Sequence, residues 1–389
     1  MPAKGIVGTS ALVGAAAIAG LSLVTRGAVP GGFFGGALGG AIGALLGLGV
    51  ERFLRSKVRA APPPVLVDPE APILKIEGLR IRFETEGGGV AAVDDVSLSL
   101  TPGETVGIVG ESGSGKSQIL MSIMGLLARN GTASGSVQLR GQEILGMRDQ
   151  DLDRLRGAVM SIIFQDPMTS LNPFLRVSTQ LTEVLIKHRG MGRAEAMRQA
   201  IVMLDRVGIP DAAKRIRLYP HEFSGGMRQR VMISMALLCQ PAVLFADEPT
   251  TALDVTIQAQ ILELIKELAA TMGTTVVLVT HDLGVVASLC DRVVVLYGGR
   301  IMESGPAEQI FAAPLHPYTK GLLESMPRLD EKVHGKLHTI PGQPPSLPRP
   351  TPGCPFEPRC ESRQPECRVL RPRVQSSNGR TLACHEVVL

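Results

Sequence analysis

A glycine-rich turn between an apolar strand and a helix is the segment that most constrains how this chain can fold. Residues 110–117 read Gly-Glu-Ser-Gly-Ser-Gly-Lys-Ser, which fits G-x-x-x-x-G-K-[ST], and they follow the apolar run Thr105–Val109. In this context the glycines let backbone N–H groups face phosphates, a lysine neutralises phosphate charge and a serine ligates Mg²⁺. The residues predicted to bind the phosphates or the metal ion are Gly110, Ser112, Gly113, Gly115, Lys116 and Ser117.

A second glycine-rich helix start lies well downstream. Ser224, Gly225 and Gly226 precede the helical run Met227–Leu238. The first turn of a helix leaves backbone N–H groups unpaired, so it attracts anions. One nucleotide cannot readily use both glycine-rich sites of a single subunit. The second site is therefore predicted to contact a nucleotide that is bound to another subunit.

Two acids end the apolar strand Ala242–Ala246. Asp247 is predicted to hold Mg²⁺ through water, and Glu248 is predicted to polarise the attacking water as a general base. The plainer alternative, two solvated acids at a strand end, is disfavoured because a phosphate-binding loop precedes them.

Two more polar residues follow apolar strands. Gln165 comes after Val159–Phe164, where an amide can ligate Mg²⁺ and position water, although a Gln before Asp-Pro is more often a turn residue. His281 follows Thr275–Val279, where a neutral imidazole can reach the γ-phosphate, against the alternative of a purely structural histidine. With Glu248 and Lys116 they complete the predicted catalytic set.

Two further residues are predicted to contribute to nucleotide binding. Asp254 lies just past the paired acids, where a subunit interface would form. Phe83 lies upstream of the glycine-rich loop and can stack on adenine, although a phenylalanine in the core of a strand is nearly as good an interpretation.

The central part of the chain alternates strands and helices. The charge of +4 over 389 residues gives no sign of nucleic-acid binding. Early strands without helices predict an antiparallel subdomain, and the later alternation predicts a parallel sheet. The expected strands are Leu74–Phe83, Val90–Leu100, Thr105–Val109, Ser136–Leu139, Val159–Phe164, Ala242–Ala246, Thr275–Val279 and Arg292–Leu296. The expected helices are Lys116–Leu127, Val177–Lys187, Arg193–Val207, Met227–Leu238 and Thr256–Thr271.

The first 59 residues are apolar and rich in glycine. Before residue 51 the only charged side chains are Lys4 and Arg26, and basic residues follow between 52 and 59. Two runs long enough to span a bilayer suggest a transmembrane hairpin with a cytoplasmic end, and a loosely ordered extension is the alternative. Residues 60–72 are predicted to be a proline-stiffened linker.

The last segment, residues 326–389, is rich in proline and cysteine and is predicted to form a small C-terminal domain. Its cysteines are Cys354, Cys360, Cys367 and Cys384. Four thiolates that converge on one centre suit an iron–sulfur cluster or Zn²⁺, and a segment without metal is the remaining alternative. His385 could replace one thiolate, although Cys384 is the preferred fourth ligand.

The order of these motifs resembles the ATP-binding cassette ATPases over residues 73–325. The resemblance implies an α/β fold of the P-loop NTPase type, with a parallel sheet core, an antiparallel β subdomain and a helical subdomain. It also implies a head-to-tail dimer with two ATP molecules. Each ATP would lie between the P-loop of one subunit and the Ser-Gly-Gly helix of the other, so that binding closes the dimer and hydrolysis reopens it.

The finer resemblance is to the D-type ATPase of oligopeptide and dipeptide importers. It rests on residues 163–173, 219–230, 246–254, 316–319 and 340–345. Phe223 and Met227 depart from the wider cassette pattern, where Leu and Gln are usual, and Met227 lacks the hydrogen bonds of an amide. The match extends through residues 353–360 and favours a [4Fe–4S] cluster over zinc in the tail.

This resemblance implies an energy-coupling ATPase on the cytoplasmic face of the inner (plasma) membrane. Its expected partners are a distinct F-type ATPase chain, two permease subunits and, indirectly, an external substrate-binding protein. A homodimer stays open as an alternative, as do nickel or glutathione import and a non-transport cassette ATPase.

Overall fold

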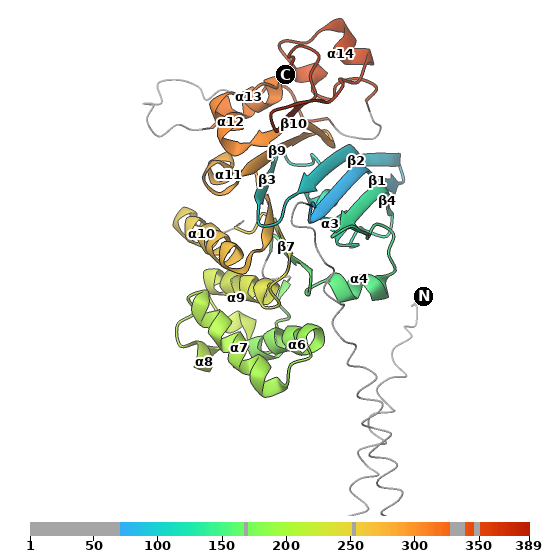
Figure 1. Cartoon of the computed structure of the whole chain (residues 1–389). Coiled ribbons are helices and arrows are strands. Elements are labelled where there is room, and N and C mark those ends of the chain that lie inside the picture. Colours follow the sequence, from blue (N-terminus) through green and yellow to red (C-terminus); the bar gives the residue numbers. More distant parts are fainter. Residues whose placement is uncertain (1–70, 167–169, 251–253, 327–338, 346–350) are drawn as a thin grey trace, which may run out of the picture. The chain divides into compact units, whose positions relative to one another are not determined.

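The computed structural model describes residues 71–166, 170–250, 254–326, 339–345 and 351–389 of the chain. Residues 61–389 form one compact unit, drawn in colour where described (Figure 1). The predicted membrane hairpin in 1–59 lies outside the described residues, as does all but the end of the linker. No helix among the described ranges is long and apolar enough to cross a membrane.

A four-stranded antiparallel sheet forms the first layer, in the order β2-β1-β4-β5. Buried apolar residues alternate with exposed polar ones along β1, as a sheet with one covered face requires. Its strands are β1 (Leu74–Thr85), β2 (Gly88–Leu100), β4 (Gly131–Leu139) and β5 (Gln142–Glu143). The predicted antiparallel subdomain is thus present. For β4 the sequence predicts only the last four residues, because the small and polar residues at its start give little strand signal.

The central sheet has eight strands in the order β11-β12-β10-β9-β3-β8-β7-β6. The strands β6, β7, β8, β3 and β9 pair in parallel, and β7 and β8 are buried along their whole length. Their bounds are β3 (Thr105–Val109), β6 (Met160–Ile163), β7 (Val243–Asp247), β8 (Thr275–Val279), β9 (Arg292–Tyr297), β10 (Arg300–Pro306), β11 (Gln375–Ser377) and β12 (Arg380–Leu382). Parallel pairing brings the carboxyl ends of β3, β6, β7 and β8 to one edge, where ligands bind in open α/β sheets.

Helices α6 to α9 form the helical subdomain at one end of the chain's coloured part (Figure 1), with α6, α7 and α9 in mutual contact. The α-helices are α3 (Lys116–Ile123), α4 (Asp149–Leu155), α6 (Val177–Arg189), α7 (Arg193–Arg206), α8 (Ala212–Arg215), α9 (Gly225–Leu237), α10 (Val255–Met272), α11 (Leu283–Leu289), α12 (Ala307–Ala312), α13 (Pro317–Glu324) and α14 (Pro365–Val369). Two 3₁₀ turns, η1 (Pro220–Glu222) and η2 (Glu357–Arg359), complete the described elements. Helix α3 ends earlier than expected, because Gly125 turns with a φ of 63°.

The cysteine-rich tail is joined to the central sheet. Strand β12 pairs antiparallel with β10, with Leu382 opposite Glu303, and β11 pairs with β12. Glu303 is fully buried and forms an ion pair with Arg380, with 2.5 Å between Oε1 of Glu303 and Nη2 of Arg380. The boundary predicted after residue 325 stays a prediction, but β11 and β12 extend the same sheet that carries β3.

Gly107 in the middle of β3 is expected to be required by packing. A Cβ atom there would lie 2.6 Å from Cγ1 of Val286 and 3.0 Å from Sγ of Cys290 on the covering helix. The Gly107→Ala variant should therefore lose about 1–3 kcal/mol of unfolding free energy through overpacking. Gly87→Ala in an open hairpin turn is the control and should keep its melting temperature. Equal melting temperatures for both variants and the wild type would contradict this account of α11 packing.

Candidate functional site

The P-loop, residues 110–117, connects β3 to α3 through a turn that only glycine can make. Gly110 and Gly115 have φ angles of 152° and 100°. A Cβ atom on Gly110 would lie 2.1 Å from the carbonyl oxygen of Leu296, and one on Gly115 would lie 2.4 Å from that of Ala92. Gly115 is also the N-cap of α3 and offers no side-chain hydrogen bond. The first backbone N–H groups of α3 are therefore left for an anion.

Lys116 lies in the P-loop with its amino group against the loop's own backbone. Its side chain is buried, and Nζ donates hydrogen bonds of 2.8 Å and 3.0 Å to the carbonyl oxygens of Gly110 and Glu111. Burial lowers the pKa of Lys116, and the charges of Glu248, Asp247 and Glu111 oppose this change. Lys116 Nζ thus rests on two backbone oxygens, and its hydrogen bonds can transfer to phosphate oxygens.

Ser117 and Asp247 meet across the sheet edge. The Ser117 hydroxyl donates a hydrogen bond of 2.9 Å to Oδ1 of Asp247, although 130 positions separate the two residues. Asp247 ends the fully buried strand β7, and burial raises the pKa of its carboxyl group. A hydroxyl and a carboxylate that face each other offer oxygen ligands of the kind Mg²⁺ prefers.

Glu248 lies at the centre of the polar residues. Its φ of 45° is unusual for a residue with a side chain, and its N–H donates a 2.9 Å hydrogen bond to the carbonyl oxygen of Val279 on β8. Such a backbone conformation costs on the order of 1–3 kcal/mol and persists only where the surrounding structure enforces it. It directs Glu248 out of the sheet, where Gln165 Nε2 donates to Oε2 at 3.0 Å and His281 Nδ1 lies 3.4 Å from Oε1.

The structure therefore brings Gln165, Glu248 and His281 together from the ends of three strands, beside the Ser117–Asp247 pair. The Gln165 amide nitrogen is occupied by Glu248, which leaves the amide oxygen for a metal ion. The side chain of His281 is 71% exposed, so the imidazole is open to solvent. The roles assigned to these residues stay predictions, but their juxtaposition suits attack of a water molecule on a bound phosphate.

The second glycine-rich site is a surface feature. Ser224 is the N-cap of α9, its hydroxyl accepts a 3.4 Å hydrogen bond from the N–H of Met227, and Ser224 and Gly225 are exposed. Phe223 is buried in the core of the helical subdomain, which explains why another apolar residue can replace the usual Leu there. The start of α9 is thus free to meet a ligand from outside this chain.

The two remaining predicted binding residues occupy structural positions. Asp254 is the N-cap of α10, and its carboxylate accepts a 3.0 Å hydrogen bond from the N–H of Ile257. Phe83 is half-buried in β1, and its ring lies so close to Gly131 that a Cβ there would be 2.6 Å from Cε1. Their predicted contacts with nucleotide stay predictions.

Sequence reasoning missed residues that act across long separations. Gln229 on α9 is buried and donates a hydrogen bond to the carbonyl oxygen of Pro249, directly after Glu248. Glu111 of the P-loop pairs with Arg359, and its N–H donates to the hydroxyl of Tyr318. No local sequence pattern pairs residues so far apart. Helix periodicity could only have indicated that Gln229 lies on the buried face of α9.

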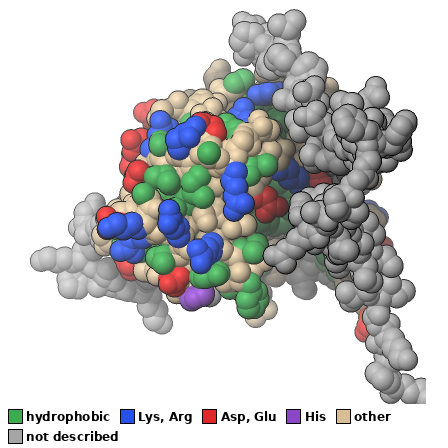
Figure 2. Space-filling model, turned by 90° about the horizontal axis from the view of Figure 1, so that it is seen from below, with side chains coloured by type: hydrophobic (Ala, Val, Ile, Leu, Met, Phe, Trp, Pro, Cys, Tyr) green, Lys and Arg blue, Asp and Glu red, His purple; other side chains and the backbone are tan. Residues whose placement is uncertain are grey.

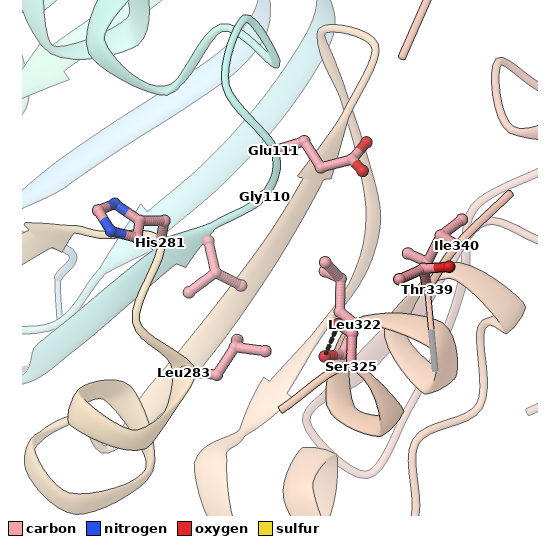
Figure 3. Close-up of a pocket in the computed structure, with 9 residues that line it drawn as sticks. Gly110, Glu111, His281, Leu283, Leu322, Ser325, Thr339 and Ile340 are labelled. Carbon is pink, nitrogen blue, oxygen red and sulfur yellow. Dashed lines mark hydrogen bonds between the residues drawn. The ribbon is translucent and has the colours of Figure 1, made fainter. Parts of the chain in front are cut away.

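A cavity of about 370 Å³ adjoins the P-loop and is shown in Figure 3. Gly110 and Glu111 of the P-loop and His281 after β8 line one side of it, and Leu322 and Ile340 of the C-terminal part line the other. Figure 3 shows the Glu111 carboxylate directed away from His281. The P-loop therefore borders residues of the C-terminal segment as well as the strand-end acids.

The four tail cysteines line one small pocket, together with His316, Phe356 and His385. All six cysteines are free thiols, and burial raises the pKa of Cys354 to about 11. Within the described residues no group of three or more His, Cys, Asp or Glu side chains is arranged to hold a metal ion. The predicted convergence of the thiols is present, but the predicted metal centre is not formed by the side-chain positions. His385 Nε2 lies 3.0 Å from the carbonyl oxygen of Leu370, so this ring nitrogen already has a backbone partner.

Comparison with known proteins identifies the family. Residues 93–251 match the family described as ABC transporter, and residues 302–367 match the oligopeptide/dipeptide transporter, C-terminal region. The oligopeptide transport ATP-binding protein OppD of Salmonella typhimurium is 53% identical over 86% of this chain and 98% of its own length. The dipeptide transport ATP-binding protein DppD of Bacillus subtilis is 50% identical over 80% of this chain and 94% of its own length.

A solved structure is also similar. The dimeric ATP-binding cassette MJ0796 in a post-hydrolysis state, bound to ADP and Pi, covers 60% of this chain and 98% of its own chain, with 30% identity and a TM-score of 0.55. The likeness confirms the predicted cassette fold of the P-loop NTPase type. Because the sequence relatives match across both the cassette and the C-terminal region, the chain belongs to the family of ABC transporter ATP-binding subunits of the oligopeptide/dipeptide type.

Proposed function

We propose that this chain is the ATP-hydrolysing, energy-coupling subunit of an importer of dipeptides or oligopeptides. The observation that carries the enzymatic part is the convergence of Lys116, Glu248 and His281 at one sheet edge. The peptide substrate is supported by the names of the relatives, which are oligopeptide and dipeptide transport proteins. Nickel or glutathione import and a non-transport role are the alternatives.

The proposed reaction is attack of water on the γ-phosphate of ATP, which releases ADP and phosphate. Lys116 exchanges its two backbone partners for phosphate oxygens, and Glu248 accepts the proton of the attacking water. His281, beside Glu248, contacts the γ-phosphate. Mg²⁺ neutralises charge on the phosphates, and Ser117, Gln165 and Asp247 are the residues that suit its ligation directly or through water.

The active site is proposed to be shared between two ATPase chains. Ser224 and Gly225 lie exposed at the start of α9, as a group that binds the nucleotide of another subunit requires. The similar cassette MJ0796 is described as dimeric. The second chain is proposed to be a distinct F-type ATPase, with a homodimer as the alternative.

The permease is proposed to dock beside Gln165, at the cytoplasmic face of the inner membrane, with an external binding protein delivering the substrate. Phe174 is 87% exposed, and Leu175 and Ile186 are also exposed hydrophobic residues in this region. Seen from below, the described part of the chain presents Lys and Arg side chains among hydrophobic ones (Figure 2). A large exposed apolar side chain in the segment that follows Gln165 suits docking of a partner subunit.

We also propose that Cys354, Cys360, Cys367 and Cys384 hold a [4Fe–4S] cluster, with Zn²⁺ as the alternative. The support is that all four free thiols line one pocket. A cluster needs thiolates around a larger centre than a single ion does, so a small rearrangement of the tail is part of the proposal. The cluster has a structural role in this proposal, because it would link the segments that carry Cys354 and Cys360, Cys367, and Cys384.

Replacement of the proposed base tests the enzymatic assignment. Glu248→Gln should lower kcat for ATP about 10²–10⁴-fold, because the amide cannot accept the proton, while ATP binding is retained. Steady-state hydrolysis and equilibrium nucleotide binding measure the two effects. Glu263→Gln, on the exposed face of α10, is the control and should hydrolyse ATP normally. Hydrolysis by Glu248→Gln at the wild-type rate would remove Glu248 from its role.

The transport assignment is tested in cells that lack the chain. We expect uptake of a labelled tripeptide to be lost, to return with the wild-type chain, and to stay absent with Glu248→Gln. Uptake of nickel and of glutathione, measured in parallel, should be unchanged. Unchanged peptide uptake with loss of either alternative substrate would redirect the assignment to that substrate.

The tail proposal is tested by metal and sulfide analysis of the chain purified without oxygen. Iron and acid-labile sulfide in equal amounts, with broad visible absorbance, are expected for the wild type. Cys360→Ser should lose both, whereas Cys290→Ala, in the core behind β3, should keep them. Zinc without sulfide would select the alternative ion, and metal-free protein would reject both.

A further inference from the structure

The second residue of the P-loop is held at both its backbone and its side chain by the C-terminal part of the chain. The N–H of Glu111 donates a 3.0 Å hydrogen bond to the hydroxyl of Tyr318 on α13. The Glu111 carboxylate accepts two hydrogen bonds from Arg359 on η2, of 2.6 Å and 3.0 Å. These are the parallel contacts of a bidentate arginine–carboxylate pair, which fixes orientation as well as charge.

Arg359 is itself fixed in one position. Its side chain is 4% exposed, and it also donates to the carbonyl oxygens of Pro341 and Ile340 and to the hydroxyl of Tyr297. The hydrogen bonds with Glu111 raise the pKa of Arg359, so the guanidinium stays charged. A buried arginine with this many partners holds its carboxylate in a defined place.

Tyr318 is held as firmly. It is completely buried, and its ring lies 4.5 Å from that of Tyr297 and 5.2 Å from that of Phe356, measured between centroids. The contacts on Glu111 therefore come from two buried side chains, the Tyr318 hydroxyl in an aromatic cluster and the Arg359 guanidinium beside it.

The position of Glu111 matters for the nucleotide because Lys116 depends on it. Lys116 Nζ donates to the carbonyl oxygen of Glu111, so the backbone of Glu111 sets where the ammonium group rests before ATP arrives. The carboxylate of Glu111 is also a negative charge in a loop that must bind a polyanion. Unpaired, it would repel the phosphates, and Arg359 neutralises it.

We propose that Arg359 is a positioning residue of the ATP site, which acts through Glu111 with the help of Tyr318. In this role the C-terminal segment keeps the P-loop in a shape and charge state that accept ATP. The proposal deepens the ATPase function proposed above and rests on it.

A double-mutant cycle tests the proposal. ATP affinity is measured in a Glu248→Gln background of the full chain, so that hydrolysis plays no part in the readout. Arg359→Gln should weaken ATP binding about tenfold, because it leaves Glu111 charged and unpaired. Glu111→Gln also breaks the pair, but it leaves no unpaired negative charge beside the phosphates, so it should weaken ATP binding less than Arg359→Gln does. The double variant Glu111→Gln/Arg359→Gln should bind ATP more tightly than Arg359→Gln alone. Raising the salt concentration should shrink the defect of Arg359→Gln.

A matched control separates positioning from stability. Arg380→Gln removes another buried arginine–glutamate pair between the tail and the central sheet, in which the carboxylate belongs to Glu303 on β10 and not to the P-loop. It should lower the melting temperature and leave ATP affinity unchanged. With active-site Glu248 restored, Arg359→Gln should raise KM for ATP more than it lowers kcat.

Tyr318→Phe supplies a second variant that keeps the packing and removes only the hydroxyl. It should raise the Kd for ATP a few-fold, and this result stands even where Arg359→Gln does not fold. Wild-type ATP affinity in Arg359→Gln or in Tyr318→Phe, or the same loss in Arg359→Gln and the double variant, would overturn the proposal. A wild-type chain that binds ATP but does not hydrolyse it would overturn the ATPase function and leave this test of binding intact.

Discussion

Parallel pairing in the central sheet is the constraint on which the rest of the structure depends. Because β6, β7, β8 and β3 run in the same direction, their carboxyl ends reach one edge together. The residues proposed to bind and hydrolyse this chain's own ATP lie at or just after these ends: the P-loop after β3, Gln165 after β6, Asp247 and Glu248 at the end of β7, and His281 after β8. The buried valine and isoleucine residues of the strands therefore fix the distances between polar groups that are remote in sequence.

The local motifs made the nucleotide edge predictable from sequence. The P-loop needs its glycines for reasons of φ and space that are the same in any protein, and apolar runs that end in polar residues mark strand ends. The contacts that could not be predicted join distant segments. Nothing near Glu111 or Arg359 in the sequence indicates their ion pair, and β11 and β12 are each only three residues long, too short for a periodic signal.

The tail illustrates a different limit. Cysteine spacing predicted a common location for four thiols, and they do line one pocket. It could not predict that the same segment adds strands to the central sheet or that Arg359, next to Cys360, reaches the P-loop. The tail thus reaches the P-loop through charge and hydrogen bonds, and Cys354 and Cys360 flank the same short 3₁₀ turn in the sequence.

The account is tested most directly by a crystal structure of the full chain with Glu248→Gln, ATP and Mg²⁺. We expect Lys116 Nζ to donate to phosphate oxygens instead of its backbone partners, and the metal ion to lie beside Ser117 and Gln165. Arg359 should still donate its two hydrogen bonds to the Glu111 carboxylate. ATP phosphates bound away from the P-loop would contradict the site. Phosphates bound as expected with Arg359 detached from Glu111 would contradict the part assigned to the C-terminal segment.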